Sequence, residues 1–377
     1  MPSSLMLLTY PHRPDPRVFR ESRALVRNGV KIRLIAWDRD GDLPKRAEEN
    51  GVEVIRLGPR CPYRSAGKVL SRLPRFWFNA LRASRNVEFD LVHAHDFDTL
   101  PLALLISGLR GKPVLYDAHE LYSAMVRKDV GAFSDVLWKI ESLMARCPEE
   151  IVTVNYELAS ALSERREKIP HIVTNSPDMG VLDGADIEEI RRRHGLKGFV
   201  VSYLGSLEPG RFVEEMLDSV DPNGRIMLAI GGNGTLRPIV EKAAAANPAI
   251  RFLGTLDTDE ALRVTYASDL VLAMLDPTNP NYKISTPVKV LDAMASGRAF
   301  VTSKGLNISD KIEQLECGFI IPYDKQAFKE TLNVSSTFPK VLEGMGKKGR
   351  EYYEKELSWE KSRNELLRAY ETLVGRI

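Results

Sequence analysis

The stretch that decides the fold is "NYKISTPVKVLDAMASGRAFVTS", residues 281–303. In its middle, Val288, Leu291 and Ala295 recur at the spacing of one helix face. The apolar segment "RAFVTS", residues 298–303, then has the length of a buried strand. A helix that leads directly into a buried strand is the repeating unit of a parallel α/β sheet, so we expect an α/β fold.

The start of this helix is a candidate binding site for an anion. Thr286 suits the N-cap, Pro287 suits the first helical position and Gly297 suits the end. Free N–H groups and the positive end of the helix dipole favour a diphosphate there. Lys289 and Asp292 follow at an i, i+3 spacing. That spacing leaves two interpretations open, ligand-binding residues or an exposed pair worth about 0.2–0.5 kcal/mol.

The same alternation of helix and strand patterns extends along most of the 377 residues. The predicted strands are 5–10, 30–37, 51–58, 89–96, 112–120 and 149–155 in the first half, and 198–206, 225–232, 250–254, 269–275, 298–303 and 318–322 in the second. A polar joint, residues 174–189, separates the two series. We therefore expect two Rossmann-like, doubly wound domains, residues 1–176 and 177–357, that face one another across a ligand-binding cleft.

Composition excludes several classes of protein. The 53 basic and 51 acidic side chains nearly balance, which argues against a nucleic-acid-binding protein. Cys61, Cys147 and Cys317 are far apart and form no C-x-x-C pair, which argues against a disulfide framework or a structural zinc site. No segment reaches the ~18 consecutive apolar residues of a spanning helix, and the N-terminus lacks signal-peptide features. We therefore expect a cytoplasmic protein.

The segment "PVKVLDAMASGRAFV" resembles the "EAMAxGxPVV" helix of the family 4 glycosyltransferases, two-domain enzymes with the GT-B fold. Other parts of that family are matched in order by "DPRVFRESRALVRNGVKIRLIA", "FDLVHAHDFDTLPLAL", "KPVLYDAHELY", "VVSYLGSLEPGR" and "IRFLGTLDTDEALRVTYASDLVLAML". The segment "LSWEKSRNELLRAYETL" resembles the terminal helix that crosses back in this family. The resemblance therefore implies that residues 358–377 complete the first domain.

The resemblance also implies an activity. It implies transfer of a sugar from a UDP- or GDP-linked donor to a hydroxyl acceptor, with retention at the anomeric carbon and without a metal or another cofactor. In the family the helix acid binds the nucleotide ribose, so Asp292 is the expected ribose ligand, although the family usually has Glu there. Thr286 and Lys289 at the helix start are expected to bind the donor, as are Gly254 and Leu256 in the nucleotide-base segment.

Two further positions depart from the family pattern. Ile284 stands where many members have a Glu near the donor sugar, and Ser206 stands where many have an Arg in the phosphate loop. Arg211 is the basic residue that remains in that loop. We expect Arg211 and Ser206 to lie at the donor phosphates, with Arg211 stabilising the leaving diphosphate. The alternative for Arg211 is a solvated side chain on a turn.

His119 is the strongest single candidate for a catalytic residue. It follows the apolar segment "KPVLY", residues 112–116, and lies in the segment "DAHE" at the carboxyl end of the predicted strand, where sites of parallel sheets collect. In relatives such as the phosphatidylinositol mannosyltransferases, the matching His contacts the donor sugar and helps to arrange the acceptor. A neighbouring carboxylate would tune its imidazole toward working pH. The alternative is a capping box formed by Asp117 and Glu120, with His119 merely in the first turn.

Three other groups of polar residues have competing interpretations. Asp96 and Asp98 have the D-x-D spelling of metal-using transferases, but we interpret them as a loop with an N-cap. The glycines of "GGNG", residues 231–234, are better explained by a tight strand-to-helix turn than by phosphate binding. Charged side chains in the loop "YPHRPDPR" suit either acceptor binding or simple solvation. The acceptor candidates of that loop are His12, Arg13 and Arg17.

Residues 56–85 combine eight Lys and Arg side chains with aromatic residues and contain no acid. Such a surface suits an anionic bilayer, so we expect peripheral binding to the inner face of the membrane and a lipid or lipid-linked acceptor. The alternative is that Phe76, Trp77 and Phe78 pack into the first domain while the arginines are solvated. Two rival functions also stay open, a nucleotide-sugar epimerase of similar fold and a non-catalytic scaffold.

Overall fold

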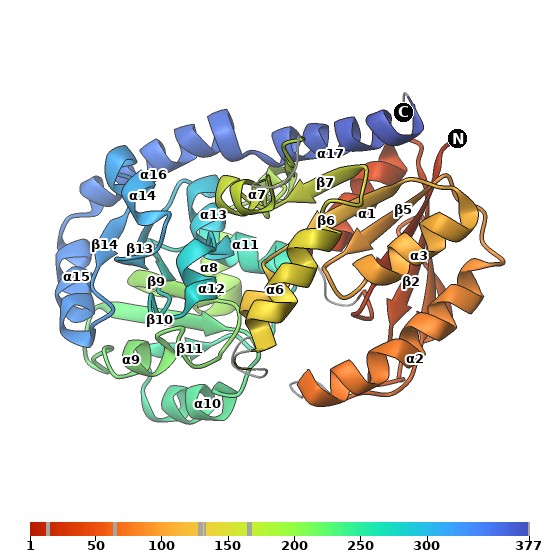
Figure 1. Cartoon of the computed structure of the whole chain (residues 1–377). Coiled ribbons are helices and arrows are strands. Elements are labelled where there is room, and N and C mark those ends of the chain that lie inside the picture. The colour runs from red at the N-terminus through yellow and green to blue at the C-terminus, as the bar shows by residue number, and fades with distance from the viewer. Residues whose placement is uncertain (13–15, 63–65, 127–130, 132, 164–167, 376–377) are drawn as a thin grey trace. The chain divides into compact units, whose positions relative to one another are not determined.

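The computed structural model describes residues 1–12, 16–62, 66–126, 131, 133–163 and 168–375. It contains two compact units (Figure 1). Unit 1 comprises Met1–Thr174 with Lys361–Ile377, and unit 2 comprises Asn175–Glu360. Each unit has its own sheet and its own hydrophobic core.

Unit 1 is built on an eight-stranded sheet in the order β3-β4-β2-β1-β5-β6-β7-β8. Its strands are β1 (Ser3–Leu8), β2 (Lys31–Trp37), β3 (Arg46–Glu49), β4 (Val52–Leu57), β5 (Leu91–His95), β6 (Val114–Ala118), β7 (Glu150–Thr153) and β8 (His171–Ile172). All neighbouring pairs are parallel except β3 with β4. Strands β5 and β6 are buried along their whole length and β1 along all but its first residue, as expected when helices cover both faces of a parallel sheet.

Helices connect these strands and cover the sheet (Figure 1). They are α1 (Pro16–Arg27), α2 (Ala66–Ser84), α3 (Leu100–Arg110), α4 (Tyr122–Met125), α6 (Phe133–Met144), α7 (Tyr156–Ser163) and α17 (Trp359–Val374). The core contains Tyr116 and a stacked pair, Trp37 and Phe76, whose ring centres are 5.1 Å apart. Gly29 has a φ of 80° and ends α1, because a left-handed residue lets the chain leave the helix.

Unit 2 contains a six-stranded parallel sheet in the order β11-β10-β9-β12-β13-β14. Its strands are β9 (Phe199–Leu204), β10 (Ile226–Gly231), β11 (Ile250–Phe252), β12 (Leu270–Ala273), β13 (Ala299–Ser303) and β14 (Phe319–Ile321). Its helical segments are η1 (Met179–Leu182), α8 (Ile187–His194), α9 (Val213–Leu217), α10 (Arg237–Ala246), α11 (Thr258–Tyr266), α12 (Pro280–Ile284), α13 (Val288–Ala295), α14 (Ser309–Leu315), α15 (Lys325–Thr337), α16 (Pro339–Tyr352) and η2 (Tyr353–Leu357). The core is formed by residues such as Tyr203, Phe212 and Phe328.

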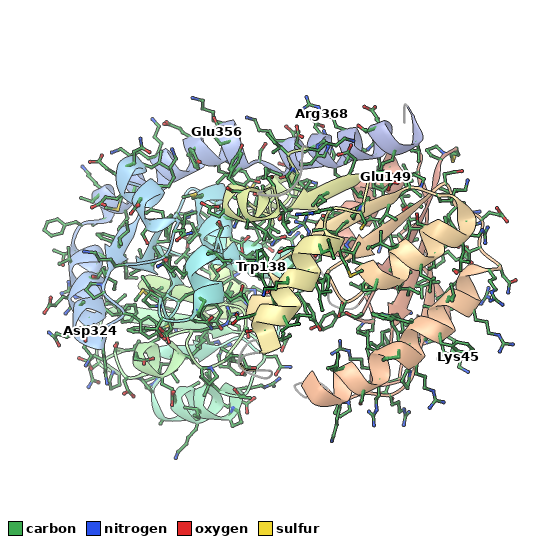
Figure 2. All side chains as sticks on the ribbon, viewed as in Figure 1. Lys45, Trp138, Glu149, Asp324, Glu356 and Arg368 are labelled. Carbon is green, nitrogen blue, oxygen red and sulfur yellow. The ribbon has the colours of Figure 1, made fainter. Side chains whose placement is uncertain are left out.

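Long charged side chains extend outward from both units, as Lys45, Glu356 and Arg368 do in Figure 2. None of the described helices is long and apolar enough to cross a bilayer. Helix α17 begins at the end of unit 2, and its later residues belong to unit 1. There the Tyr370 hydroxyl lies 3.0 Å from Ser4 Oγ, and Figure 1 shows this end of the helix near the start of the chain.

The α/β architecture with two parallel sheets is confirmed, and each of the twelve predicted strands is present. Two additional strands, β3 and β8, were not predicted. The two halves of each sheet meet at a switch point in strand order, between β1 and β5 in unit 1 and between β9 and β12 in unit 2. Ligands of doubly wound sheets bind beyond the carboxyl ends of the strands at such switch points. We therefore expect functional residues at these two switch points.

Candidate functional site

In unit 2, glycines allow the loops beyond β9 and β10 to pack backbone against backbone. Gly205 N donates to Gly231 O at 2.9 Å. A Cβ on Gly232 would lie 1.7 Å from Gly205 O, and a Cβ on Gly234 would lie 2.2 Å from Leu207 O. No other residue fits at positions 232 and 234 without moving the backbone. The interpretation of "GGNG" as a tight structural turn is confirmed.

Helix α13 begins one residue later than predicted. Its N-cap is Pro287, whose ψ of 127° is extended, so the assignment of Thr286 as N-cap is wrong. The extended ψ of Pro287 means that the helical backbone begins only at Val288, and Thr286 lies in the short connection after α12 ends at Ile284. Gly297 ends the helix with a φ of 64°, as predicted. Val288 is exposed and does not belong to the buried stripe.

The side chain of Lys289 packs against the loop beyond β9 and does not extend into solvent. Its Nζ lies 4.4 Å from the centre of the Tyr203 ring, and a Cβ on Gly205 would lie 2.8 Å from the same Nζ. The loss of water around the ammonium, together with repulsion by Arg211, lowers the pKa of Lys289 to about 7, although Asp292 opposes this shift. The interpretation of Lys289 and Asp292 as an exposed surface pair is therefore wrong.

Arg211 lies in this loop and is a second cation, close enough to Lys289 to lower its pKa. Its guanidinium carbon is 5.2 Å from the centre of the Tyr282 ring, and its buried Nε has no hydrogen-bond partner among the described residues. Burial raises the pKa of Tyr203, while the charge of Arg211 acts in the opposite direction. The Tyr203 hydroxyl donates to Ser206 O at 2.7 Å. Tyr203 thus has a guanidinium and an ammonium beside it.

The remaining donor-side candidates divide into two groups. Ser206 and Asp292 are half-buried and lie near the two cations. The Ser206 carbonyl accepts a hydrogen bond from Tyr203, and the charge of Asp292 acts on Lys289. Gly254 is one strand further away, where its carbonyl accepts a hydrogen bond from Gly232 N at 2.8 Å. Leu256 packs against the hydrophobic cluster that contains Ile190 and Val200. The structure therefore brings Ser206, Arg211, Lys289 and Asp292 together.

In unit 1, a buried ion pair organises the carboxyl ends of the strands. Arg17 donates through Nη2 to Asp117 Oδ1 at 2.6 Å and through Nε to Asp117 Oδ2 at 2.9 Å. Arg17 Nη1 also donates to Val173 O at 2.5 Å. Of the two interpretations, acceptor binding and simple solvation, solvation is wrong for Arg17, because it lies in α1 and is 6% exposed. His12 is buried too, and Arg13 lies outside the described residues.

His119 lies between two carboxylates. Its Nε2 is 2.8 Å from Asp117 Oδ2, and its Nδ1 is 3.2 Å from Asp96 Oδ2. Burial lowers the pKa of His119, but the charges of Asp96 and Asp117 outweigh this and raise it well above the ordinary value. The expectation of a pKa near working pH is wrong, since both ring nitrogens face acceptors that favour the imidazolium. The capping-box interpretation is also wrong, because α4 begins beyond Leu121.

The two acids of the D-x-D segment have separate environments, and neither is an N-cap, because Thr99 occupies that position of α3. Asp96 has a φ of 62° and contacts His119. Asp98 is buried, and its Oδ2 accepts a hydrogen bond from Thr9 Oγ1 at 2.7 Å. Burial, reinforced by repulsion from Asp96, raises the pKa of Asp98 to about 7. Sequence reasoning missed Asp96 as a partner of His119. Its position beyond β5, at the switch point, was the available signal.

The basic and aromatic stretch at 56–85 is only partly a surface. Arg56 is buried, and its Nη2 lies 2.8 Å from Glu49 Oε1. Phe76 is fully buried, and Trp77 donates through Nε1 to Asp98 O at 2.9 Å. The expectation of an inserting aromatic cluster is therefore wrong for both rings.

The exposed part of that stretch is mainly the outer face of α2, with Arg60 exposed before the helix and Arg85 exposed directly after it. Leu70 is 58% exposed and Phe78 is 65% exposed. The cations Lys68, Arg75, Arg82 and Arg85 are exposed around them. Tyr63 and Arg64 lie outside the described residues.

Two glycosyltransferase family models match the sequence. The model of Glycosyltransferase Family 4 matches residues 17–177, and the model of Glycosyl transferases group 1 matches residues 198–334. No curated protein matches the sequence closely enough to count as a relative.

Solved structures show the same fold at low sequence identity. Sucrose-phosphate synthase from Thermosynechococcus elongatus is 16% identical, with a TM-score of 0.79 over 98% of this chain and 99% of that one. Anabaena HepE in complex with UDP-glucose is 15% identical, with a TM-score of 0.73 over 98% and 100%. WaaG, a glycosyltransferase involved in lipopolysaccharide biosynthesis, is 15% identical, with a TM-score of 0.66 over 99% and 100%. The two family matches identify the chain as a member of the family 4 type of glycosyltransferases, and the solved structures show that it has the GT-B fold.

Proposed function

We propose that the chain transfers a sugar from a UDP- or GDP-linked donor to a hydroxyl acceptor, with retention at the anomeric carbon. The observation that supports the donor assignment is the pair of cations, Arg211 and Lys289, beside Tyr203. A nucleotide diphosphate sugar carries two negative charges on its diphosphate, and it would relieve the repulsion between these cations. HepE, which has the same fold, was solved with UDP-glucose, and this favours uridine as the base.

Donor binding, in this proposal, needs no divalent metal. A guanidinium can bind phosphate oxygens in a bidentate manner, and an ammonium adds a point charge. Together they supply the two positive charges that a divalent ion would otherwise supply to the diphosphate. Asp292, one turn beyond Lys289, is our proposed ligand for the ribose hydroxyls. We assign Gly254 to a backbone contact with the nucleotide.

The chemical step follows from these charges. The bond between the anomeric carbon and the phosphate oxygen breaks, and the acceptor oxygen forms its bond on the same face of the sugar. Arg211 and Lys289 stabilise the negative charge that develops on the leaving diphosphate. The departing phosphate oxygen accepts the proton of the acceptor hydroxyl. We do not assign this proton to His119, because both of its nitrogens already face carboxylates.

His119 has a different role in this proposal. It is a fixed cation that Asp96 and Asp117 hold in place, and it orients the donor sugar and the acceptor. Arg17 acts one step further away, because it fixes Asp117. On the acceptor side we retain His12, in the loop after β1.

Transfer is tested by incubating the protein with UDP- and GDP-sugars, with and without acceptor extracts, in EDTA. We expect a glycosylated product by mass spectrometry, with the anomeric configuration of the donor in its NMR spectrum. Isomerised sugar from the donor alone would indicate an epimerase instead. A product with inverted configuration would contradict the proposed mechanism.

For the acceptor we propose a lipid or lipid-linked molecule at the inner face of the membrane. The outer face of α2, as defined above, carries two exposed apolar side chains among exposed cations. Figure 2 shows blue-tipped side chains extending from this helix. Each basic residue near an anionic surface contributes about 1 kcal/mol to binding, and Leu70 and Phe78 can enter the interface.

Co-sedimentation with vesicles that contain phosphatidylglycerol tests this surface. We expect binding at low salt that Arg75→Gln with Phe78→Ser greatly weakens. The matched control is Lys340→Gln with Phe338→Ser, which removes an exposed cation and an exposed Phe from unit 2. Equal losses in both double variants, or no binding by the native protein, would favour a water-soluble acceptor.

A further inference from the structure

Unit 1 contains a second polar cluster that the proposed reaction does not use. Its members are Glu21 on α1 and His93 and His95 on β5, all with 0% exposure. One nitrogen of each histidine, one oxygen of Glu21 and one oxygen of Asp117 lie within 4.8 Å of one another. Two imidazoles and a carboxylate side by side in a core call for an explanation, because buried polar groups normally have partners.

The outer contacts of the two histidines leave one nitrogen of each available. His93 Nδ1 lies 3.0 Å from the Tyr370 hydroxyl, and His95 Nδ1 lies 3.1 Å from Asp117 Oδ2. Because a carboxylate only accepts, His95 donates from Nδ1, and its Nε2 carries the lone pair. The Tyr370 hydroxyl also lies 3.0 Å from Ser4 Oγ, which allows the same tautomer for His93. A histidine held in this way by its outer nitrogen has the arrangement typical of a metal ligand.

The inner atoms of the cluster have no donor among themselves. Across the described residues, His93 Nε2, His95 Nε2 and both oxygens of Glu21 have no hydrogen-bond partner. Arg17 Nε lies 3.1 Å from Glu21 Oε1. Burial, reinforced by the charge of Asp117, nevertheless raises the pKa of Glu21 to about 8, although Arg17 and His119 oppose this shift, so a bound metal ion would displace the carboxyl proton. Asp117 is different, because its oxygens already accept from Arg17, His95 and His119. Asp117 therefore orients His95 and is not a further ligand.

We propose that Glu21, His93 and His95 bind one divalent transition-metal ion, with zinc as the best fit. Two imidazole nitrogens and one carboxylate oxygen are a ligand set that zinc accepts, with a fourth position left for water. Tetrahedral bonds of about 2.0–2.1 Å need ligand atoms about 3.3 Å apart, so binding draws the side chains inward. The ion would join α1 to β5, and through the contact of His93 with Tyr370 it would join both to α17.

Metal content tests the site directly. The full chain is unfolded in denaturant with a chelator, refolded with an excess of zinc or cobalt, and dialysed against EDTA. We expect about one metal ion per chain by mass spectrometry, and cobalt bands typical of a four-coordinate site in the visible spectrum. X-ray absorption of the cobalt form should show two imidazole ligands.

Variants locate the ion. Glu21→Gln and His93→Gln should lose the metal, whereas His171→Gln should keep it, because His171 lies in unit 1 and contacts Glu365 and Glu150 instead. If the cluster variants do not fold, the absorption spectrum of the native chain still decides. Native protein that retains no metal after refolding would overturn the proposal, and a buried water would then bridge the three side chains. Metal retained equally by His93→Gln and the native chain would also overturn it.

Discussion

The Nζ atom of Lys289 lies 4.4 Å from the centre of the Tyr203 ring, so the face of one aromatic side chain receives the ammonium that would otherwise reach solvent. A cation over a ring gains about 0.5–2 kcal/mol. This gain is smaller than the free energy that the ammonium loses when its water is removed, since burial lowers the pKa of Lys289 to about 7. The charged form of Lys289 is therefore poorly stabilised in the unliganded protein, as expected of a group that binds an anionic ligand.

Lys289→Met should stabilise the unliganded protein while it weakens donor binding. The pKa of Lys289 is lowered in the folded state, so the unfolded chain binds the proton more tightly. The folded protein is therefore penalised below pH 7, and the penalty fades as pH rises toward the ordinary value of about 10.4. At pH 7 we expect a gain of about 1–2 kcal/mol for the variant, after allowance for solvent screening.

Denaturant unfolding at pH 7 and pH 10 measures this difference. The matched control is Lys283→Met, which removes an exposed lysine of α12. A variant at position 289 that is less stable than the native protein at pH 7 would contradict the described electrostatics.

The affinity for a nucleotide sugar should fall as pH rises above 7. The free protein loses the Lys289 proton near pH 7, whereas the bound diphosphate raises the pKa of the ammonium and retains the proton. Binding therefore takes up a proton, and affinity falls by up to tenfold per pH unit until the pKa of the bound state. Titration calorimetry with UDP-glucose from pH 6 to 9 tests this. Lys289→Arg, which stays charged, should show a flat profile; a sloping one would reject Lys289 as the titrating group.

Arg17→Ala should destabilise unit 1 by about 3–5 kcal/mol, because it leaves the buried Asp117 without its bidentate partner. Arg33→Ala serves as the control, since Arg33 pairs with the more exposed Glu53. That pair should contribute less than about 1 kcal/mol. Denaturant unfolding of both variants measures the difference, and equal effects would show that Arg17 does not anchor Asp117.

His119→Ala should lower turnover by about 10²–10⁴-fold and leave donor affinity nearly unchanged. The reason is that His119 lies in unit 1, whereas the donor cations belong to unit 2. Asp96→Asn, which removes one of its carboxylates, should give a smaller loss of turnover. Steady-state kinetics with direct donor titration separates the two quantities. Normal turnover by a folded His119→Ala protein would show that His119 has only a structural role.

The sequence predicted the strands well because buried parallel strands are nearly continuous apolar runs. It missed β3, "RAEE", because an antiparallel edge strand with alternating exposure has no such run. It missed β8 because two residues carry no periodicity. It misplaced the start of α13 by one residue, since Thr286 and Pro287 both fit the first positions of a helix.

Most residues of the candidate site could be named from the sequence, but their contacts with one another could not. Arg17 and Asp117 are 100 positions apart in the chain, so no local pattern connects them. Lys289 was predicted as a donor ligand from its helix. Its contact with the loop at Gly205 depends on a glycine that leaves space for an ammonium, and this is visible only in the folded structure.

Donor binding in EDTA tests the central claim most directly. Titration calorimetry of the native protein with a panel of UDP-, GDP- and ADP-sugars should find at least one that binds without metal. Arg211→Gln and Lys289→Met should each weaken that donor by about 10–100-fold, as expected for loss of one charge-assisted contact of about 1.5–3 kcal/mol. Arg237→Gln changes a half-buried arginine of α10 that pairs with Glu241, and it should not change the affinity. Binding that requires Mn²⁺, or that survives in both Arg211→Gln and Lys289→Met, would contradict the account.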